Sequence, residues 1–182
     1  MRFTILVLLL VVLCSCKTWK TYTIQAGKHS SGNVDKPVVN VEGIEFEFRT
    51  NNTWYYDEPV SPGWNKIRGF SFGHHQNNSS ARLGYQCFDD TLLVVGAYCY
   101  VNGVSPQENP AQKGIIDTIQ PGMTYRCRII YESGKFKFFF QDKYWEGPAG
   151  EKKDVGYILN PYIGGIFTLD HDWYTEIKDN KY

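Results

Sequence analysis

Short runs in which apolar and polar residues alternate recur along most of the chain and predict β-strands. Residues 44–49, IEFEFR, and residues 135–140, KFKFFF, carry large apolar side chains at every second position, which is the period of a strand with one buried face. No stretch has a helical period with caps. Many short strands at this spacing predict an all-β fold, a β-sandwich or barrel. The predicted strands are 38–49, 66–73, 81–88, 92–101, 114–118, 124–132, 135–141, 155–159, 163–169 and 173–178.

Residues 70–101 are predicted to form three consecutive strands, and the pattern fixes the register of the last two. A loop at residues 89–91 leaves one face of this hairpin apolar, whereas a one-residue slip would mix the faces. The other face carries two facing glycines, which either form a shallow floor for a flat ligand or pack against a neighbouring loop. The predicted cross-strand pairs are Leu83–Ala97, Tyr85–Val95 and Cys87–Leu93 on the apolar face, and Arg82–Tyr98, Ser80–Tyr100 and Gly84–Gly96 on the other.

The first fifteen residues have the pattern of a secretory signal peptide, with an unbroken apolar run over residues 5–13 that is too short to span a membrane. The run ends in Leu13-Cys14-Ser15-Cys16, which resembles the bacterial lipoprotein signal. The resemblance implies cleavage before Cys16 and a lipid on its sulfur. An ordinary signal peptide that happens to end in Cys is the alternative.

Three segments follow from this interpretation. Residues 1–15 are predicted to be the lipoprotein signal peptide, residues 16–36 a lipidated flexible tether rich in polar residues, and residues 37–182 the β-sandwich domain. Lys17, rather than Asp, follows Cys16, so nothing resembles an inner-membrane retention signal. We therefore expect an outer-membrane lipoprotein of the bacterial cell envelope, facing either side.

Charge and cysteine content narrow the class of function. The chain has 19 basic and 19 acidic residues and no basic stripe, which argues against a nucleic-acid partner. Cys87, Cys99 and Cys127 are an odd number and do not make a disulfide framework. We expect three buried thiols, with a Cys99–Cys127 bond left open. No Cys or His spacing indicates zinc, and the sequence predicts neither a metal nor a cofactor.

Two long stretches resemble a known family of β-sandwiches. Residues 121–143, PGMTYRCRIIYESGKFKFFFQDK, and residues 161–179, PYIGGIFTLDHDWYTEIKD, are similar to a hairpin and the late strands of jelly-roll domains. The relevant family comprises concanavalin A-like lectins, glucanases and laminin-G-like domains. The resemblance implies an antiparallel jelly-roll sandwich that either binds or cleaves carbohydrate. The acidic motif of the glucanases and the paired strand motifs of jelly-roll alginate lyases are absent.

Aromatic residues make up 16% of the chain, and two long predicted loops carry several Trp and Tyr residues. If successive strands alternate in direction, loop 50–65 and loop 142–154 lie side by side at one end of the sandwich, where recognition usually occurs. Aromatic rings in such loops can stack on sugars; alternatively they fold down and cap the core. The candidate ligand-binding residues of the two loops are Trp54, Tyr55, Trp64, Tyr144 and Trp145.

Two polar clusters are further candidates. A corner containing His74, His75 and Asn77 could hydrogen-bond a sugar beside Arg82, Tyr98 and Tyr100, or be a turn whose side chains satisfy local backbone groups. Residues 170–172, Asp-His-Asp, suggest a metal or pH-sensitive site or, alternatively, a solvated corner before the last strand.

The sequence predicts a lipid-anchored envelope protein that binds a glycan without catalysis, and no residue is assigned a catalytic role. One alternative is a jelly-roll polysaccharide lyase or glycoside hydrolase that uses His74 or His75 with Tyr98 or Tyr100. No convincing acid–base pair supports it. The other alternative is a structural lipoprotein that contacts an envelope protein through an exposed apolar patch.

Overall fold

The computed structural model describes residues 18–56, 64–74, 78–165 and 168–181. Cys16, His75 and Asn77 lie outside these ranges, so the predictions made for them stay predictions. Twelve strands are described: β1 Lys20–Ile24, β2 Lys36–Val39, β3 Gly43–Arg49, β4 Asn65–Phe72, β5 Ser79–Phe88, β6 Leu92–Tyr100, β7 Lys113–Ile119, β8 Thr124–Glu132, β9 Lys135–Phe140, β10 Lys143–Pro148, β11 Val155–Leu159 and β12 Trp173–Lys181. Two single turns of 3₁₀-helix, η1 Asn52–Trp54 and η2 Pro110–Gln112, lie between strands.

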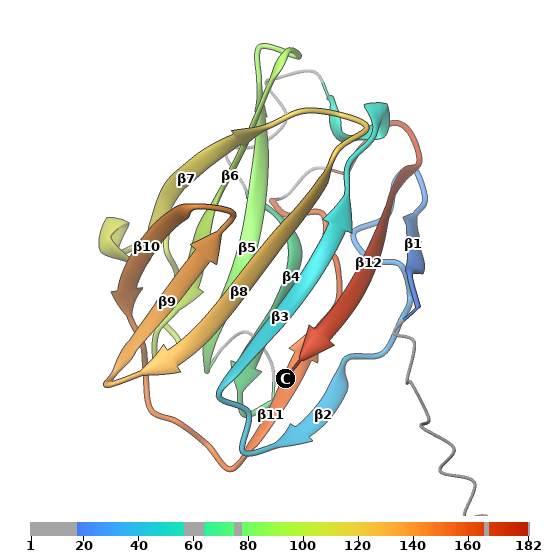
Figure 1. Ribbon diagram of the computed structural model, residues 1–182. Helices are drawn as coiled ribbons and strands as arrows, with labels where there is room; N and C mark the ends of the chain where they lie inside the picture. The colour runs from blue at the N-terminus through green and yellow to red at the C-terminus, as the bar shows by residue number, and fades with distance from the viewer. Residues whose placement is uncertain (1–17, 57–63, 75–77, 166–167, 182) are drawn as a thin grey trace, which may run out of the picture.

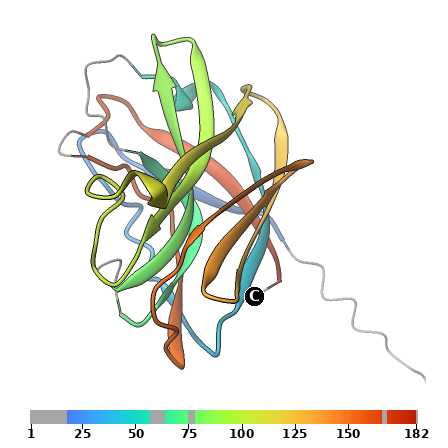
Figure 2. The ribbon, with the colours of Figure 1, turned by 90° about the vertical axis from the view of Figure 1, so that its left-hand side faces the viewer.

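The strands form two six-stranded sheets in which every described pair is antiparallel. The β3 sheet has the order β1-β12-β3-β8-β9-β10, and the β5 sheet has the order β2-β11-β4-β5-β6-β7. The sheets pack face to face (Figures 1 and 2), which confirms the predicted antiparallel jelly-roll sandwich. None of the described segments is a helix long and apolar enough to cross a membrane.

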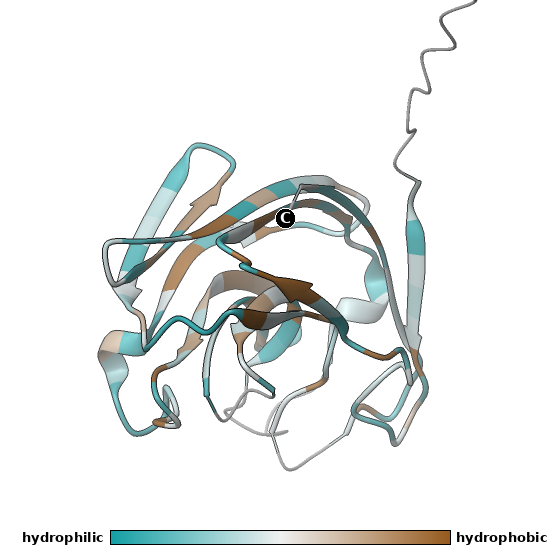
Figure 3. Cartoon of the chain, turned by 90° about the horizontal axis from the view of Figure 1, so that it is seen from below, coloured by the Kyte–Doolittle hydropathy of each residue, from teal (hydrophilic) through white to brown (hydrophobic). Residues whose placement is uncertain are grey.

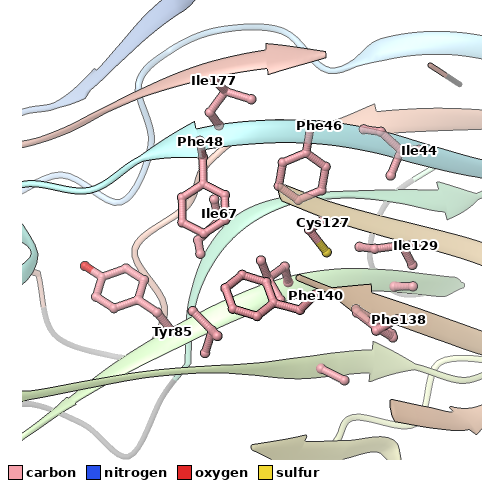
Figure 4. Close-up of a cluster of buried hydrophobic side chains, with 14 of the residues drawn as sticks. Ile44, Phe46, Phe48, Ile67, Tyr85, Cys127, Ile129, Phe138, Phe140 and Ile177 are labelled. Atoms are coloured by element: carbon pink, nitrogen blue, oxygen red, sulfur yellow. The ribbon is translucent and has the colours of Figure 1, made fainter. Parts of the chain in front are cut away.

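Hydrophobic and hydrophilic residues alternate along strands of both sheets (Figure 3), and the buried hydrophobic side chains form one core cluster. Alternation on β3, β8 and β9 sends Phe46, Phe48, Phe138 and Phe140 inward, where they meet Tyr85 and other residues of the β5 sheet (Figure 4). These side chains are fully buried, and each such burial stabilises the fold by about 1.5–3 kcal/mol. The period-two pattern in the sequence is therefore the direct cause of the two-layer architecture.

The β5–β6 hairpin has the predicted register at all six cross-strand pairs. Its loop is closed by Asp89 and Asp90, both with positive φ, a conformation that Asp tolerates better than most residues. Leu83, Tyr85 and Cys87 face the core, as expected. Cys87, Cys99 and Cys127 are buried and form no disulfide with one another, which confirms the prediction of three buried thiols.

The prediction of a flexible tether over residues 16–36 is wrong from Lys20 onward. Strand β1 pairs with β12 along its whole length, and Tyr22 and Ile24 belong to the core. A polar composition concealed this strand, because only two of its five side chains are buried. The sandwich therefore begins at Lys20 rather than at residue 37.

Three further boundaries differ from the sequence prediction. Residues 38–49 are not one strand: Asn40 has a positive φ and separates β2, in the β5 sheet, from β3, in the β3 sheet. The predicted loop 142–154 contains β10. The described part of residues 163–169 belongs to no strand. Its Ile163 N–H donates to the His29 carbonyl and its Gly164 N–H donates to Asn65 Oδ1, which hold the segment as a loop.

We predict that Ile24→Ala lowers the free energy of unfolding by about 2–5 kcal/mol, because it leaves a cavity in the core. Thr23→Ala, on the exposed side of the same strand, is the matched control and should stay within about 0.5 kcal/mol of wild type. Urea denaturation monitored by tryptophan fluorescence measures both. Equal and small effects would mean that β1 contributes nothing to the sandwich.

Candidate functional site

The outer face of the β5 sheet brings together polar and aromatic side chains from three adjacent strands. Arg82 on β5 lies opposite Tyr98 on β6, and Lys66 on β4 lies opposite Gly84 on β5. Because Leu83 and its alternate neighbours face the core, Arg82 and Gly84 face outward on the same strand. We call the set Lys66, Arg82, Tyr98, Tyr100 and Tyr162 the cation–tyrosine cluster.

A β-bulge at Ile67 turns Lys66 toward this face. The pairing of β4 with β5 steps from Lys66–Gly84 to Arg68–Leu83, so Ile67 is an extra residue in β4. A bulge of this kind reverses the alternation of side chains on one side of it. Ile67 consequently enters the core, and Lys66 lies within 4.5 Å of the Tyr98 ring centroid.

The Gly84–Gly96 floor is occupied by a side chain of the protein itself. A Cβ atom at Gly96 would overlap the ring of Trp64 and the carbonyl oxygen of Gly114, and one at Gly84 would lie 3.0 Å from Trp64 Cε3. Trp64 is almost completely buried. Of the two interpretations, packing against a neighbouring segment is therefore the correct one, and the glycines are needed to admit the indole.

Two cations lie buried together in the cluster. Lys66 and Arg82 are each only 7% exposed, and neither takes part in an ion pair with any described residue. Arg82 Nε is buried without a hydrogen-bond partner, as is the neighbouring Ser80 Oγ. Burying an unpaired charge is costly, so this arrangement destabilises the protein on its own.

The electrostatics of the cluster reflect that cost. Burial, together with the nearby charge of Arg82, lowers the pKa of Lys66 to about 7. Burial also lowers the pKa of Arg82, and Asp35 opposes this effect most strongly. Asp35 accepts a hydrogen bond from the Asn160 backbone N–H at 2.8 Å and forms no ion pair with Arg82. Near neutral pH the cluster thus holds between one and two positive charges.

Tyrosines complete the cluster on its solvent side. Tyr98 is buried, and its hydroxyl donates to Gln107 Oε1 at 2.9 Å; burial raises the pKa of Tyr98. Tyr100 and Tyr162 are half-buried, and the Tyr162 ring centroid lies 5.9 Å from Lys66 Nζ. Backbone hydrogen bonds of 2.7 and 2.9 Å join Lys66 to Tyr162. The cluster can therefore offer cations, hydroxyls and aromatic surface to one ligand.

Of the predicted polar site residues, Arg82, Tyr98 and Tyr100 fall in this cluster. Lys66 and Tyr162, and Asp35 beside the cluster, were not predicted as site residues. Alternation alone gave no sign of the bulge that turns Lys66 outward. Tyr162 and Asp35 reach the site from loops distant in sequence.

In the described parts of loops 50–65 and 142–154, Trp54, Tyr55 and Trp145 do not form the predicted pair of aromatic binding surfaces. Trp54 is 0% exposed and packs on Phe48 and Trp173, while half-buried Tyr55 packs against the core. These two side chains cap the core, which was the alternative interpretation. Trp54 cannot stack on a sugar while the core is intact.

Trp145 lies in strand β10 rather than in a loop, and its indole packs against Gly114 of β7 and edge-on to Phe138. It closes the gap between the edges of the two sheets. Tyr144, on the same strand, is 51% exposed. Its hydroxyl bonds to Glu146 on the far side of the sandwich from Arg82, so it does not join the cluster.

The two histidine-containing clusters have local partners. His74 is exposed and packs edge-on against Tyr157, while its backbone carbonyl accepts a bond from Asn78, as in the predicted turn. His171 contacts Asp170 and the Thr53 carbonyl. Among the residues with described positions, no group of three or more His, Cys, Asp or Glu side chains could hold a metal ion.

Two shallow hollows of about 340 and 370 Å³ lie on the outer face of the β3 sheet. They share Glu45 and Arg128 as lining residues. Glu45 is paired with Arg126 at 2.6 Å, and the Arg128 guanidinium stacks on Phe139 at 4.5 Å. These charges already have partners, so the hollows are weaker candidates than the cation–tyrosine cluster.

We predict that the free energy of unfolding rises between pH 7 and pH 9 by up to about 1.4 kcal/mol per pH unit more in wild type than in Lys66→Met. Folding shifts the Lys66 pKa from 10.5 to about 7, so in this window the unfolded chain binds the extra proton and rising pH favours the folded state. Urea titrations at several pH values measure this difference. Lys135→Met, at an exposed position, should follow wild type, and parallel curves for Lys66→Met would contradict the prediction.

Comparison with known proteins finds solved structures of similar fold. No protein-family model matches the chain, and no curated protein sequence matches it. A polysaccharide lyase of family 18 superposes with a TM-score of 0.52 and 9% identity over 93% of this chain and 91% of its own. A Saccharomyces cerevisiae protein of unknown function gives 0.55 and 10% over 92% and 97%. The marine PL7 alginate lyase of Zobellia galactanivorans gives 0.52 and 13% over 90% and 65%. At these identities the likeness establishes the jelly-roll sandwich fold.

Proposed function

We propose that the protein is a lipid-anchored, non-catalytic glycan-binding protein of the bacterial cell envelope. Its binding site is the cation–tyrosine cluster on the outer face of the β5 sheet. The observation that carries this proposal is the burial of Lys66 and Arg82 side by side, neither of them in an ion pair with a described residue.

The chemistry of the cluster indicates which glycans fit. Two buried cations are stabilised by an anion that accepts their hydrogen bonds, and Arg82 Nε has a donor to spare. Half-buried Tyr100 and Tyr162 offer hydroxyls and ring faces at the solvent side. A carboxylate or sulfate group on a sugar matches both features, so the preferred ligand is an acidic glycan.

The structural neighbours support a glycan ligand without identifying one. The family 18 polysaccharide lyase and the PL7 alginate lyase share this chain's architecture over nine-tenths of its length. Both names denote enzymes that act on polysaccharides. Because the sequence identities are only 9% and 13%, the proposed ligand class rests on the residues of the cation–tyrosine cluster.

A polysaccharide lyase is the second candidate, and one observation favours it. An amine with a pKa of about 7 can act as a general base at neutral pH, and Lys66 lies against Tyr98. The same role is not supported for His74, which is exposed and packs on Tyr157. We favour binding because the Tyr98 hydroxyl is engaged with Gln107 and its raised pKa makes it a poor general acid to work with Lys66.

We predict that, on an array of acidic and neutral glycans, the protein binds the acidic ones. Arg82→Leu should weaken this binding roughly tenfold to a hundredfold, which is the loss expected for one charge-assisted hydrogen bond. Binding should also weaken as the pH rises above 7, because Lys66 loses its charge. Arg126→Leu, which removes a cation from the outer face of the β3 sheet, is the matched control and should bind as wild type does.

Three outcomes would count against this function. Equal binding of neutral and acidic glycans would show that Lys66 and Arg82 do not select the ligand by its charge. Release of new reducing ends from a bound polysaccharide would favour the lyase. A blank array with correctly folded protein would move the proposal to a protein partner in the envelope.

We predict that Cys16→Ser abolishes lipid attachment and shifts the protein from the detergent phase to the aqueous phase on Triton X-114 separation. The reason is that acyl chains on Cys16 are the proposed anchor. Cys14→Ser leaves Cys16 in place and is the control. Mass spectrometry of the mature N-terminus identifies the modification, and an unmodified terminus in the wild type would contradict the anchor.

A further inference from the structure

The early start of the sandwich leaves almost no chain between the proposed lipid and the folded domain. Only Lys17 and Thr18 separate Cys16 from Trp19, and β1 begins at Lys20. Three residues of fully extended chain reach about 10 Å. A lipid on Cys16 therefore places Trp19 within about 10 Å of the point where the acyl chains leave the bilayer.

Trp19 is held on one particular face of the sandwich. Tyr22 and Ile24 point into the core, so the odd-numbered positions of β1 and the preceding Trp19 face outward from the β3 sheet. The Arg49 guanidinium carbon lies 4.1 Å from the Trp19 ring centroid, and Lys178 Nζ lies 5.8 Å from it. These contacts, on β3 and β12, tie the indole to the outer face of that sheet.

The surroundings of Trp19 have the composition of a membrane interface. Arg49 and Lys178 flank the indole. Lys20, next in the chain, lies on the other side of β1, with its Nζ 4.7 Å from the Tyr22 ring centroid. Glu176 and Glu47 pair with Arg49 and Lys178, so the charges beside the indole are balanced. Tryptophan with basic neighbours is typical of the headgroup region of a bilayer.

We propose that the outer face of the β3 sheet around Trp19 rests on the phospholipid headgroups of the membrane that holds the Cys16 lipid. The inference rests on the lipid anchor of the proposed function. The outer faces of the two packed sheets point in opposite directions (Figure 2). This contact therefore turns the outer face of the β5 sheet, with Lys66 and Arg82, away from the bilayer. The domain is thus held in one orientation rather than swinging on a tether.

The test uses full-length lipidated protein in phosphatidylethanolamine–phosphatidylglycerol vesicles. Spin labels are attached to Thr21→Cys, on the outer face of the β3 sheet, or to Ile115→Cys, 59% exposed on β7 of the β5 sheet. The buried native thiols, with the pKa values of Cys99 and Cys127 raised by burial, should not react. We expect the Thr21 label to be several-fold less accessible to a water-soluble nickel complex than the Ile115 label, and equal accessibility would overturn the proposal.

A linker variant and a mass measurement separate the possible causes. Insertion of a long Gly-Ser linker between Lys17 and Thr18 should restore access of the nickel complex to the Thr21 label. Unchanged protection of that label would show that the short connection between Cys16 and Trp19 does not set the orientation, and would overturn the proposal. An unacylated Cys16 would overturn the premise. Acidic-glycan binding by the same vesicles is read independently, so a failed orientation with intact binding leaves the glycan site standing.

Discussion

The pairing of β5 with β6 in a single register is the constraint on which both faces of the β5 sheet depend. It places Leu83, Tyr85 and Cys87 in the core. By the same alternation it places Arg82 and the glycine pair outside. A slip of one residue would bury Arg82 between the sheets and expose Tyr85. The stability of the core therefore fixes the position of the site, although the two have opposite chemical character.

Most of the fold could be predicted from alternation because each strand has one buried face, and the long strands β5, β6, β8 and β9 were found with nearly correct ends. β1 was missed because two apolar side chains in a polar stretch are too weak a signal. The split between β2 and β3 depends on the positive φ of Asn40, which no hydrophobic pattern encodes.

The candidate site was predictable only where it lies on the hairpin. Arg82, Tyr98 and Tyr100 were found because a register relates them. Counting back from Phe72 and Phe70 by simple alternation places Lys66 on the core side, and the extra residue Ile67 reverses this. The aromatic prediction failed for a different reason. Trp54 is large enough to close the end of the core, and burial of such a ring competes with display on the surface.

The two buried cations of the cluster lower the free energy of unfolding, whereas the core that the strand register creates raises it. Replacing a buried charged group with an apolar residue of similar volume often leaves the free energy of unfolding unchanged or raises it. Lys66 and Arg82 are therefore not needed for the stability of the fold. Burial lowers the pKa of Lys66 to about 7, because the charged amine is disfavoured in this environment. An anion that enters between the two cations would raise that pKa and recover part of the cost. If the proposed acidic glycan binds here, its affinity and the folding stability are coupled through the Lys66 amine, and binding is favoured on the acidic side of neutrality.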